Sequence, residues 1–279
     1  MKETHISINS LRLCICSWGQ PQGSTVLILH GWLDHAGAWS KVADHLANQG
    51  HHVIIPDQRG HGKSDYGPAS SHYHFADYVA DVMELVKQQG SEEFSLIGHS
   101  MGGTVATLHT AFSPRKPKKL ILIEGLGPVH ESEAMAAKRY KQHLKQRLEG
   151  TEHRPMPSLS NAAKKLRRIN NIAVDWSLEQ ARRLTVERES QFYWRWDPRH
   201  RQKSAVGFHL PRHLSMLSHI DVPTDLIFGE TSWYKGIPDL QHRIDAFSCT
   251  PRQHRINSGH SPHLECPKDL SRMLCDLLE

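Results

Sequence analysis

The pattern of apolar and polar positions along the 279-residue chain switches repeatedly between the two-residue period of strands and the 3.6-residue period of helices. Short apolar runs predict strands at residues 5–8, 12–18, 25–29, 52–55, 94–97 and 120–123. Helical patterns separate most of the later strands, at residues 38–49, 75–89 and 101–112. Strands separated by helices need crossover connections, so the pattern predicts a mostly parallel sheet flanked by helices.

This alternation stops over residues 128–215, which carry no clear strand. Helices are expected there at residues 131–149, 159–170 and 177–189. After residues 210–220 the alternation resumes, with strands expected at 224–228 and 253–256 and helices at 239–247 and 267–278. The simplest organisation is one parallel-sheet domain built from residues 1–127 and 216–279, interrupted by a helical insertion at 128–215.

Composition narrows the class of protein. With 38% hydrophobic and 23% charged residues, the chain can bury one sizeable core and is not generally disordered. Its apolar runs are far shorter than the ~18 residues of a membrane helix, and no secretory signal is recognisable at the start. The five cysteines form no CxxC pair, and their odd number argues against a disulfide scaffold. We therefore expect a cytoplasmic protein that has no membrane partner.

The net charge of +5 is unevenly distributed. Residues 128–215 contain 18 Lys/Arg and 9 Asp/Glu, a formal charge of +9. Nucleic acids attract such a patch, but no fingerprint of a DNA- or RNA-binding fold surrounds it, so no nucleic-acid partner is expected. Two interpretations stay open: solvated helix faces, or a small-molecule substrate that carries a carboxylate, a phosphate or a coenzyme A thioester.

The strongest chemical signal is Gly98-His99-Ser100-Met101-Gly102, between the predicted strand 94–97 and the helix that begins at Met101. A G-x-S-x-G sequence at a strand-to-helix turn forces the serine into a strained conformation and exposes its hydroxyl above the sheet. The glycines on either side avoid collisions at this turn. We therefore predict Ser100 as a catalytic nucleophile.

A serine nucleophile needs an oxyanion hole and a general base. The backbone N–H of Met101 is one expected oxyanion donor, and that of Trp32, in the His30-Gly31-Trp32 loop after strand 25–29, is the other. Among 22 histidines, His260 follows the last predicted strand, where a base could reach the serine. His263 is expected to be structural, and no metal-ligand spacing is present, so we predict neither a metal nor a cofactor.

Four motifs occur in the order and at the spacing of the α/β-hydrolase superfamily, which the chain resembles. They are the segments 30–34 (HGWLD), 57–64 (DQRGHGKS), 98–103 (GHSMGG) and 259–267 (GHSPHLECP). The resemblance implies an eight-stranded, mostly parallel sheet flanked by helices, with the helical insertion as a cap after the sixth strand. It also implies that the turn 57–64 is structural and holds its loop beside the site.

Within the superfamily, HGWLD and the segments 123–128 (IEGLGP) and 194–197 (WRWD) resemble the serine hydrolase-like proteins. One position departs from the superfamily pattern. The triad acid usually follows the seventh strand as G-x-x-D, but here Gly229-Glu230-Thr231-Ser232 places a serine there. We assign the acid to Glu124, at the carboxyl end of strand 120–123, because active-site groups of α/β sheets collect at such ends. Glu230 is the rival, and Glu124 could alternatively only cap its strand or pair with a cap arginine.

The sequence therefore predicts a serine hydrolase that cleaves an ester, a thioester or a related acyl bond of a small molecule through an acyl-Ser100 intermediate. The serine disfavours the dehalogenase and epoxide hydrolase branches, which use an aspartate at this position. Two alternatives remain: hydrolysis of a C–C bond or a lyase reaction with the same triad, or a non-catalytic binding protein on the hydrolase fold.

Overall fold

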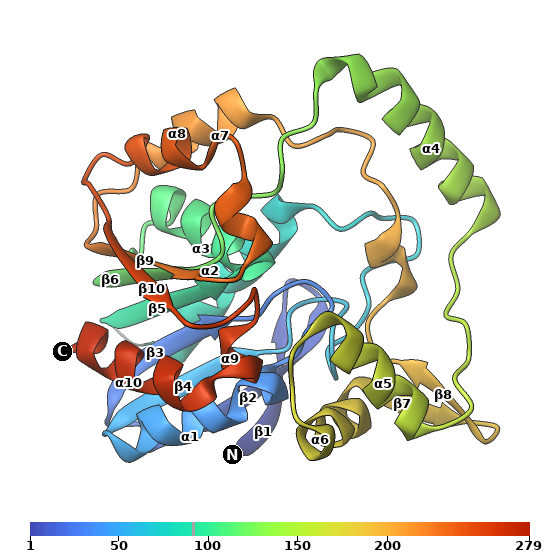
Figure 1. The fold of residues 1–279 in the computed structure, drawn as a ribbon, viewed down its shortest axis with the longest axis horizontal. Helices are drawn as coiled ribbons and strands as arrows, with labels where there is room; N and C mark the ends of the chain where they lie inside the picture. Colours follow the sequence, from blue (N-terminus) through green and yellow to red (C-terminus); the bar gives the residue numbers. More distant parts are fainter. Residues whose placement is uncertain (91–92) are drawn as a thin grey trace.

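A computed structural model describes residues 1–90 and 93–279. Its main element is an eight-stranded sheet in the order β1-β2-β4-β3-β5-β6-β9-β10 (Figure 1). The strands are β1 (Lys2–Ile8), β2 (Leu11–Trp18), β3 (Ser24–Leu29), β4 (His51–Pro56), β5 (Phe94–His99), β6 (Lys119–Ile123), β9 (Thr224–Gly229) and β10 (Arg252–Ile256). From β4 to β10 all neighbouring strands are parallel, whereas β1 pairs with β2 and β2 with β4 in the antiparallel sense. The predicted fold class is confirmed.

The antiparallel start of the sheet comes from a tight hairpin. Only Asn9 and Ser10 separate β1 from β2, and both have positive φ, 45° and 66°. Two consecutive residues with positive φ form a hairpin turn whose twist matches the right-handed twist of the strands that they join. The connection is therefore too short for a crossover, and β1 and β2 must be antiparallel.

Helices cover both faces of the sheet because its strands are apolar on both faces (Figure 1). Side chains alternate between the faces: along β3, Leu27 and Leu29 belong to one core cluster and Val26 and Ile28 to the other. The first cluster is covered by α2 (Phe75–Gln89), α3 (Met101–Phe112), α7 (Leu210–Leu217) and α8 (Leu240–Asp245). The second is covered by α1 (Ser40–Asn48) and α10 (Pro267–Leu278).

The chain between β6 and β9 leaves the sheet and forms the structure on the right of Figure 1. It contains α4 (Ala136–Glu149), α5 (Leu159–Ile169), α6 (Val174–Leu184), β7 (Thr185–Arg188) and β8 (Gln191–Trp194). Helices α5 and α6 pack together around a small core of their own. The last helix, α7, instead packs against α3 and α8 of the sheet domain. The division at residues 127 and 215 stays a prediction.

The expectation that residues 128–215 contain no strand is wrong. A helix was expected over 177–189, but α6 ends at Leu184 and the chain continues as the hairpin of β7 and β8. Glu189 and Ser190 form its turn with positive φ values of 49° and 60°. Such a pair closes a two-residue hairpin, so local turn geometry overrides the helical pattern here.

Among the described residues, no helix has the length and the apolar character needed to cross a membrane.

Candidate active site

Ser100 lies at the turn between β5 and α3, with φ 51° and ψ −114°. The turn is possible because of its glycines. A Cβ on Gly102 would lie 2.2 Å from the Leu29 carbonyl oxygen, and one on Gly98 would lie 2.6 Å from the Gly102 carbonyl oxygen. Side chains at either position would push the turn open. The G-x-S-x-G spacing therefore has a direct steric origin.

A second close approach joins this turn to the end of β6. A Cβ on Gly103 would lie 2.6 Å from Gly125 Cα, and a Cβ on Gly125 would lie 2.7 Å from Gly103 Cα. The Ser100 N–H also donates a hydrogen bond of 2.9 Å to the Ile123 carbonyl oxygen. Because the two backbones touch, the residue between Ile123 and Gly125 is held close to the serine. That residue is Glu124.

His260 lies on the loop after β10 and connects the two turns. Its Nε2 atom is 3.0 Å from Ser100 Oγ, and its Nδ1 atom is 3.1 Å from Glu124 Oε2. The His260 side chain is 24% exposed, whereas that of Glu124 is completely buried. The three residues thus form one continuous chain of hydrogen bonds. The structure brings together the predicted nucleophile, base and acid.

The Glu124 carboxylate is fully engaged by donors. Oε1 accepts a hydrogen bond of 2.6 Å from the Gly229 N–H, and Oε2 accepts one from the Ser232 hydroxyl in addition to facing His260. Glu124 has a positive φ of 53°, which a non-glycine residue adopts only when its surroundings hold it there. The rival residue, Glu230, is exposed, and none of its carboxylate contacts reaches His260 among the described residues.

The backbone of His260 is held by two side chains that the sequence analysis did not single out for this purpose. Glu265 Oε2 accepts from the Gly259 N–H at 2.8 Å, and Oε1 accepts from the Ser261 N–H at 3.2 Å. His99 Nε2–H donates to the His260 carbonyl oxygen at 2.8 Å. Glu265, which is the last residue of the short helix α9 (Pro262–Glu265) and comes four residues after the N-cap Ser261, is the sequence signal for this clamp.

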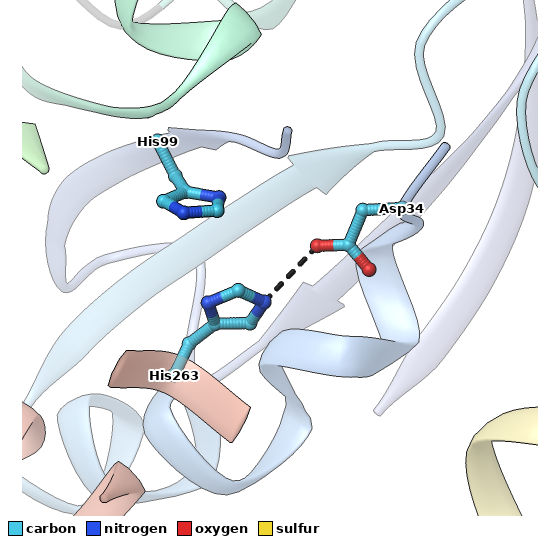
Figure 2. Close-up of side chains that lie close together, drawn as sticks. All are labelled: Asp34, His99 and His263. Carbon is cyan, nitrogen blue, oxygen red and sulfur yellow. Dashed lines mark hydrogen bonds and ion pairs between the residues drawn. The ribbon is translucent and has the colours of Figure 1, made fainter. Parts of the chain in front are cut away.

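Asp34, His99 and His263 lie close together (Figure 2). His263 Nε2 is 3.0 Å from Asp34 Oδ2, and the His263 ring stacks on Trp39 at 4.3 Å. Burial alone would raise the pKa of Asp34, but the hydrogen bond and charge of His263 outweigh it and hold that pKa far below its usual value. His263 is therefore a hydrogen-bond partner of Asp34 and a packing partner of Trp39.

Burial lowers the pKa of His99 well below 6.5, and the nearby rings of His263 and His260 add to this shift. The His99 ring is therefore neutral and carries its proton on Nε2, which donates to His260. One oxygen of Asp34 and one nitrogen from each of His99 and His263 lie within 4.8 Å of one another, which is a possible set of metal ligands. However, Asp34 and His263 are already hydrogen-bonded to each other, so a metal would have to displace that bond.

Both predicted oxyanion donors lie beside Ser100. The loop after β3 touches the serine, because a Cβ on Gly31 would lie 3.4 Å from Ser100 Cβ. Trp32 follows on this loop, and Met101 begins α3. In the part of the chain that the structure describes, neither Trp32 nor Met101 donates its N–H to a backbone carbonyl. Their role as oxyanion donors stays a prediction.

The turn after β4 supports this loop from below. Asp57 is buried and accepts hydrogen bonds from the N–H of Ala36 at 2.7 Å and of Lys63 at 2.8 Å. The Ser64 hydroxyl donates to the Asp57 carbonyl oxygen. The hydrogen bond from Ala36 joins the turn at residues 57–64 to the segment that follows the Trp32 loop, and the other two bonds lie within the turn itself.

Two cavities meet at Ser100, and Trp32, Ser100 and Trp233 line both of them. The smaller, about 320 Å³, is surrounded mainly by aromatic and apolar side chains: Tyr73, Phe75, Tyr78, Met101 and Tyr234. The larger, about 840 Å³, extends beneath α5 and also contacts His260. We name them the aromatic chamber and the α5 chamber. The chain thus encloses space for a small molecule on both sides of the serine hydroxyl.

The chain is similar to known proteins in sequence and in fold. The α/β hydrolase fold family matches residues 24–267. A serine hydrolase-like protein of Danio rerio is 28% identical over 94% of this chain and 83% of its own length. One from Dictyostelium discoideum is 27% identical over 77% of this chain and 63% of its own length.

Among solved structures, the thioesterase domain from a curacin biosynthetic pathway has a TM-score of 0.88 and 29% identity, and covers 99% of both chains. A hypothetical protein from Pseudomonas aeruginosa has a TM-score of 0.90 and 27% identity, and covers 100% of this chain and 99% of its own. The chain therefore belongs to the α/β-hydrolase fold family, is a hydrolase, and within that family resembles the serine hydrolase-like proteins.

Proposed function

We propose that this hydrolase cleaves an ester or thioester through a covalent acyl-Ser100 intermediate. The observation that carries the proposal is the continuous hydrogen-bonded chain from Ser100 Oγ through the His260 ring to Glu124 Oε2, with distances of 3.0 and 3.1 Å. A serine hydroxyl is a weak nucleophile by itself and becomes reactive beside a base that a third group orients. The likeness to a thioesterase domain, at 29% identity, supports an acyl substrate.

In the proposed reaction, His260 Nε2 takes the proton of Ser100 as Oγ attacks the substrate carbonyl carbon. The N–H groups of Trp32 and Met101 donate to the oxygen that becomes negatively charged. His260 then gives the proton to the leaving oxygen or sulfur, the bond to the acyl carbon breaks, and the acyl group remains on Ser100. A water molecule, deprotonated by His260, hydrolyses this ester and restores the hydroxyl.

Glu124 fixes the orientation and tautomer of His260 and stabilises the imidazolium that forms. The donors from Gly229 and Ser232 keep the carboxylate in place and partly replace the water that it loses on burial. Residues 128–215 would act as the cap, since α5 forms the wall of one chamber above Ser100.

A fluorophosphonate probe tests the nucleophile. Ser100 Oγ should form a bond to phosphorus with loss of fluoride, which intact-mass spectrometry detects as one adduct per chain. Ser100→Ala should abolish the adduct, His260→Ala should slow its formation strongly, and Ser215→Ala, at an exposed serine, should leave it as in the wild type.

A panel of chromogenic esters and thioesters with acyl chains of different length then tests the reaction. Hydrolysis that is lost in Ser100→Ala supports the proposal. An adduct on Ser100 without hydrolysis of any member would favour C–C bond hydrolysis or a lyase reaction. The absence of any adduct would favour a binding protein and contradict the nucleophilic role of Ser100.

A further inference from the structure

The two chambers beside Ser100 differ in charge. The aromatic chamber has one basic guanidinium in its wall, that of Arg199, and this group is neutralised by Asp197 through a contact of 2.5 Å. The α5 chamber is lined by Lys165 and Arg168 of α5 and by Arg201 of the short 3₁₀ helix Pro198–Arg201.

Among residues 1–90 and 93–279, none of these three basic side chains forms an ion pair. The acidic side chain in the wall of this chamber is Asp34, which already pairs with His263. The wall of the α5 chamber therefore contains three exposed basic side chains that have no ion-pair partner among the described residues.

The position of His260 gives the chambers different roles. Its side chain lines the α5 chamber but not the aromatic chamber. In acyl transfer the histidine must deliver its proton to the leaving atom, so the leaving group departs on the side where the ring is accessible. The acyl group then occupies the aromatic chamber.

We propose that the substrate is oriented with an uncharged acyl group in the aromatic chamber and an anionic leaving group in the α5 chamber. The leaving group is an alcohol or thiol that carries a phosphate or carboxylate, bound by Lys165, Arg168 and Arg201. Charge-assisted hydrogen bonds from guanidinium groups suit both kinds of anion. The inference rests on the proposed function, because it needs an acyl-Ser100 intermediate.

Chamber size adds a limit on the acyl group. A volume of about 320 Å³ lies at the lower end of the range of roughly 300–1,000 Å³ seen for ligand pockets, so the aromatic chamber suits a short or single-ring acyl group. The α5 chamber, at about 840 Å³, accommodates a longer leaving group. A neighbouring cavity shares Lys165 and Arg201 in its wall, which extends the basic surface away from Ser100.

Helix α5 offers a matched control. Lys164 and Arg167 lie on the same helix and are exposed like Lys165 and Arg168, but they line neither chamber. The double variants Lys165→Ala/Arg168→Ala and Lys164→Ala/Arg167→Ala therefore remove the same charge from the same helix. Only the first pair removes it from the α5 chamber.

Three chromogenic thioesters test the orientation: S-acetyl-5-thio-2-nitrobenzoate, with an anionic leaving group; S-acetyl-4-nitrothiophenol, with a neutral one; and S-succinyl-4-nitrothiophenol, with an anionic acyl group. We expect the first to be hydrolysed with a kcat/KM at least about tenfold above that of the second at low ionic strength, and this ratio to shrink at about 0.5 M salt. The third should be the poorest substrate.

In Lys165→Ala/Arg168→Ala the ratio of the first two kcat/KM values should fall by about tenfold, whereas Lys164→Ala/Arg167→Ala should keep the wild-type ratio. Equal ratios in both double variants, or a wild-type preference for charge on the acyl side, would overturn the orientation.

If the proposed function itself is wrong, the neutral thioester does not acylate Ser100. Binding of free 5-thio-2-nitrobenzoate to Ser100→Ala, measured by calorimetry, then tests the basic chamber without turnover. Binding that survives in Ser100→Ala/Lys165→Ala/Arg168→Ala with unchanged affinity would contradict the anion site.

Discussion

The hydroxyl of Ser232 donates a hydrogen bond to Glu124 Oε2, so the residue at the place where the superfamily pattern expects the acid supports the carboxylate that we propose as the acid. Ser232 comes three residues after Gly229 at the end of β9, and Glu124 directly follows the neighbouring strand β6. The Glu124 carboxylate faces His260 Nδ1 from the strand next to the one that precedes Ser232. We therefore propose that Glu124 takes the role that the superfamily pattern gives to an aspartate at position 232.

The first prediction concerns the carboxylate. Glu124→Gln preserves the shape of the side chain but removes the charge that orients and stabilises the imidazolium, so kcat should fall by about 10³–10⁴. Glu230→Gln should change kcat by less than about twofold, because Glu230 is exposed and makes no contact with His260 among the described residues. Steady-state kinetics on a neutral thioester measures both, with circular dichroism to check folding. The reverse ranking would move the acid to Glu230.

The second prediction is that the acid can be moved back. Glu124→Gly removes the carboxylate and suits the positive φ of 53° at this position. Adding Ser232→Asp places a carboxylate where the Ser232 hydroxyl now lies, next to the position of the Glu124 carboxylate that faces His260. We expect the double variant to be at least about tenfold more active than Glu124→Gly alone, from restored stabilisation of the imidazolium.

Ser232→Asp in the wild-type background should do the opposite. Two carboxylates would then face each other in a buried site, so one must take up a proton or the fold must lose stability. A melting temperature unchanged from the wild type, together with full activity, would show that the Ser232 side chain does not contact Glu124.

The third prediction concerns the clamp on the His260 loop. Gly259 and Ser261 flank the histidine, and their N–H groups donate to the Glu265 carboxylate at 2.8 and 3.2 Å. Glu265→Ala removes this acceptor. A displaced histidine no longer meets the serine, so we expect kcat to fall by about 10² with KM little changed. Glu265→Gln, which keeps one acceptor, should recover part of the loss. A purely structural role would instead lower the melting temperature and leave kcat per folded molecule unaffected.

The fourth prediction is a loss of stability in mild acid. Burial lowers the pKa of both His109 and His213 from 6.5 to about 4, and the charge of Arg243 adds to the shift of His213. Between pH 6.5 and 4 the unfolded chain therefore binds more protons than the folded chain. The free energy of unfolding should be fully retained above pH 6.5 and fall below it, by about 1.4 kcal/mol per pH unit for each histidine.

Urea denaturation between pH 7.5 and 4.5 measures this slope. His109→Phe, at a ring that already packs edge-on against Phe94, should reduce the slope by about one proton, and His213→Phe by a similar amount. Slopes identical to that of the wild type would mean that these rings titrate equally in the folded and unfolded chains.

Local sequence alone determined much of the fold. Helices at 75–89, 101–112 and 267–278 have the predicted bounds, since their amphipathic faces and end signals agree. The serine turn could be predicted because the G-x-S-x-G pattern is local, although the collision that Gly102 avoids is with the Leu29 carbonyl oxygen, which is distant in the sequence. The β7–β8 hairpin was missed, because four-residue strands give too short a pattern to distinguish from a helix.

The site beyond the serine depended on tertiary structure. The sequence assigned the acid to Glu124 and left Glu230 as the rival. The position of Glu124 close to Ser100 depends on the Gly103–Gly125 contact, which joins segments that no local pattern connects. The clamp by Glu265 and the difference in charge between the two chambers are likewise properties of packed surfaces. Local patterns report which conformation a segment prefers, whereas the direction in which a side chain points is set by what packs against it.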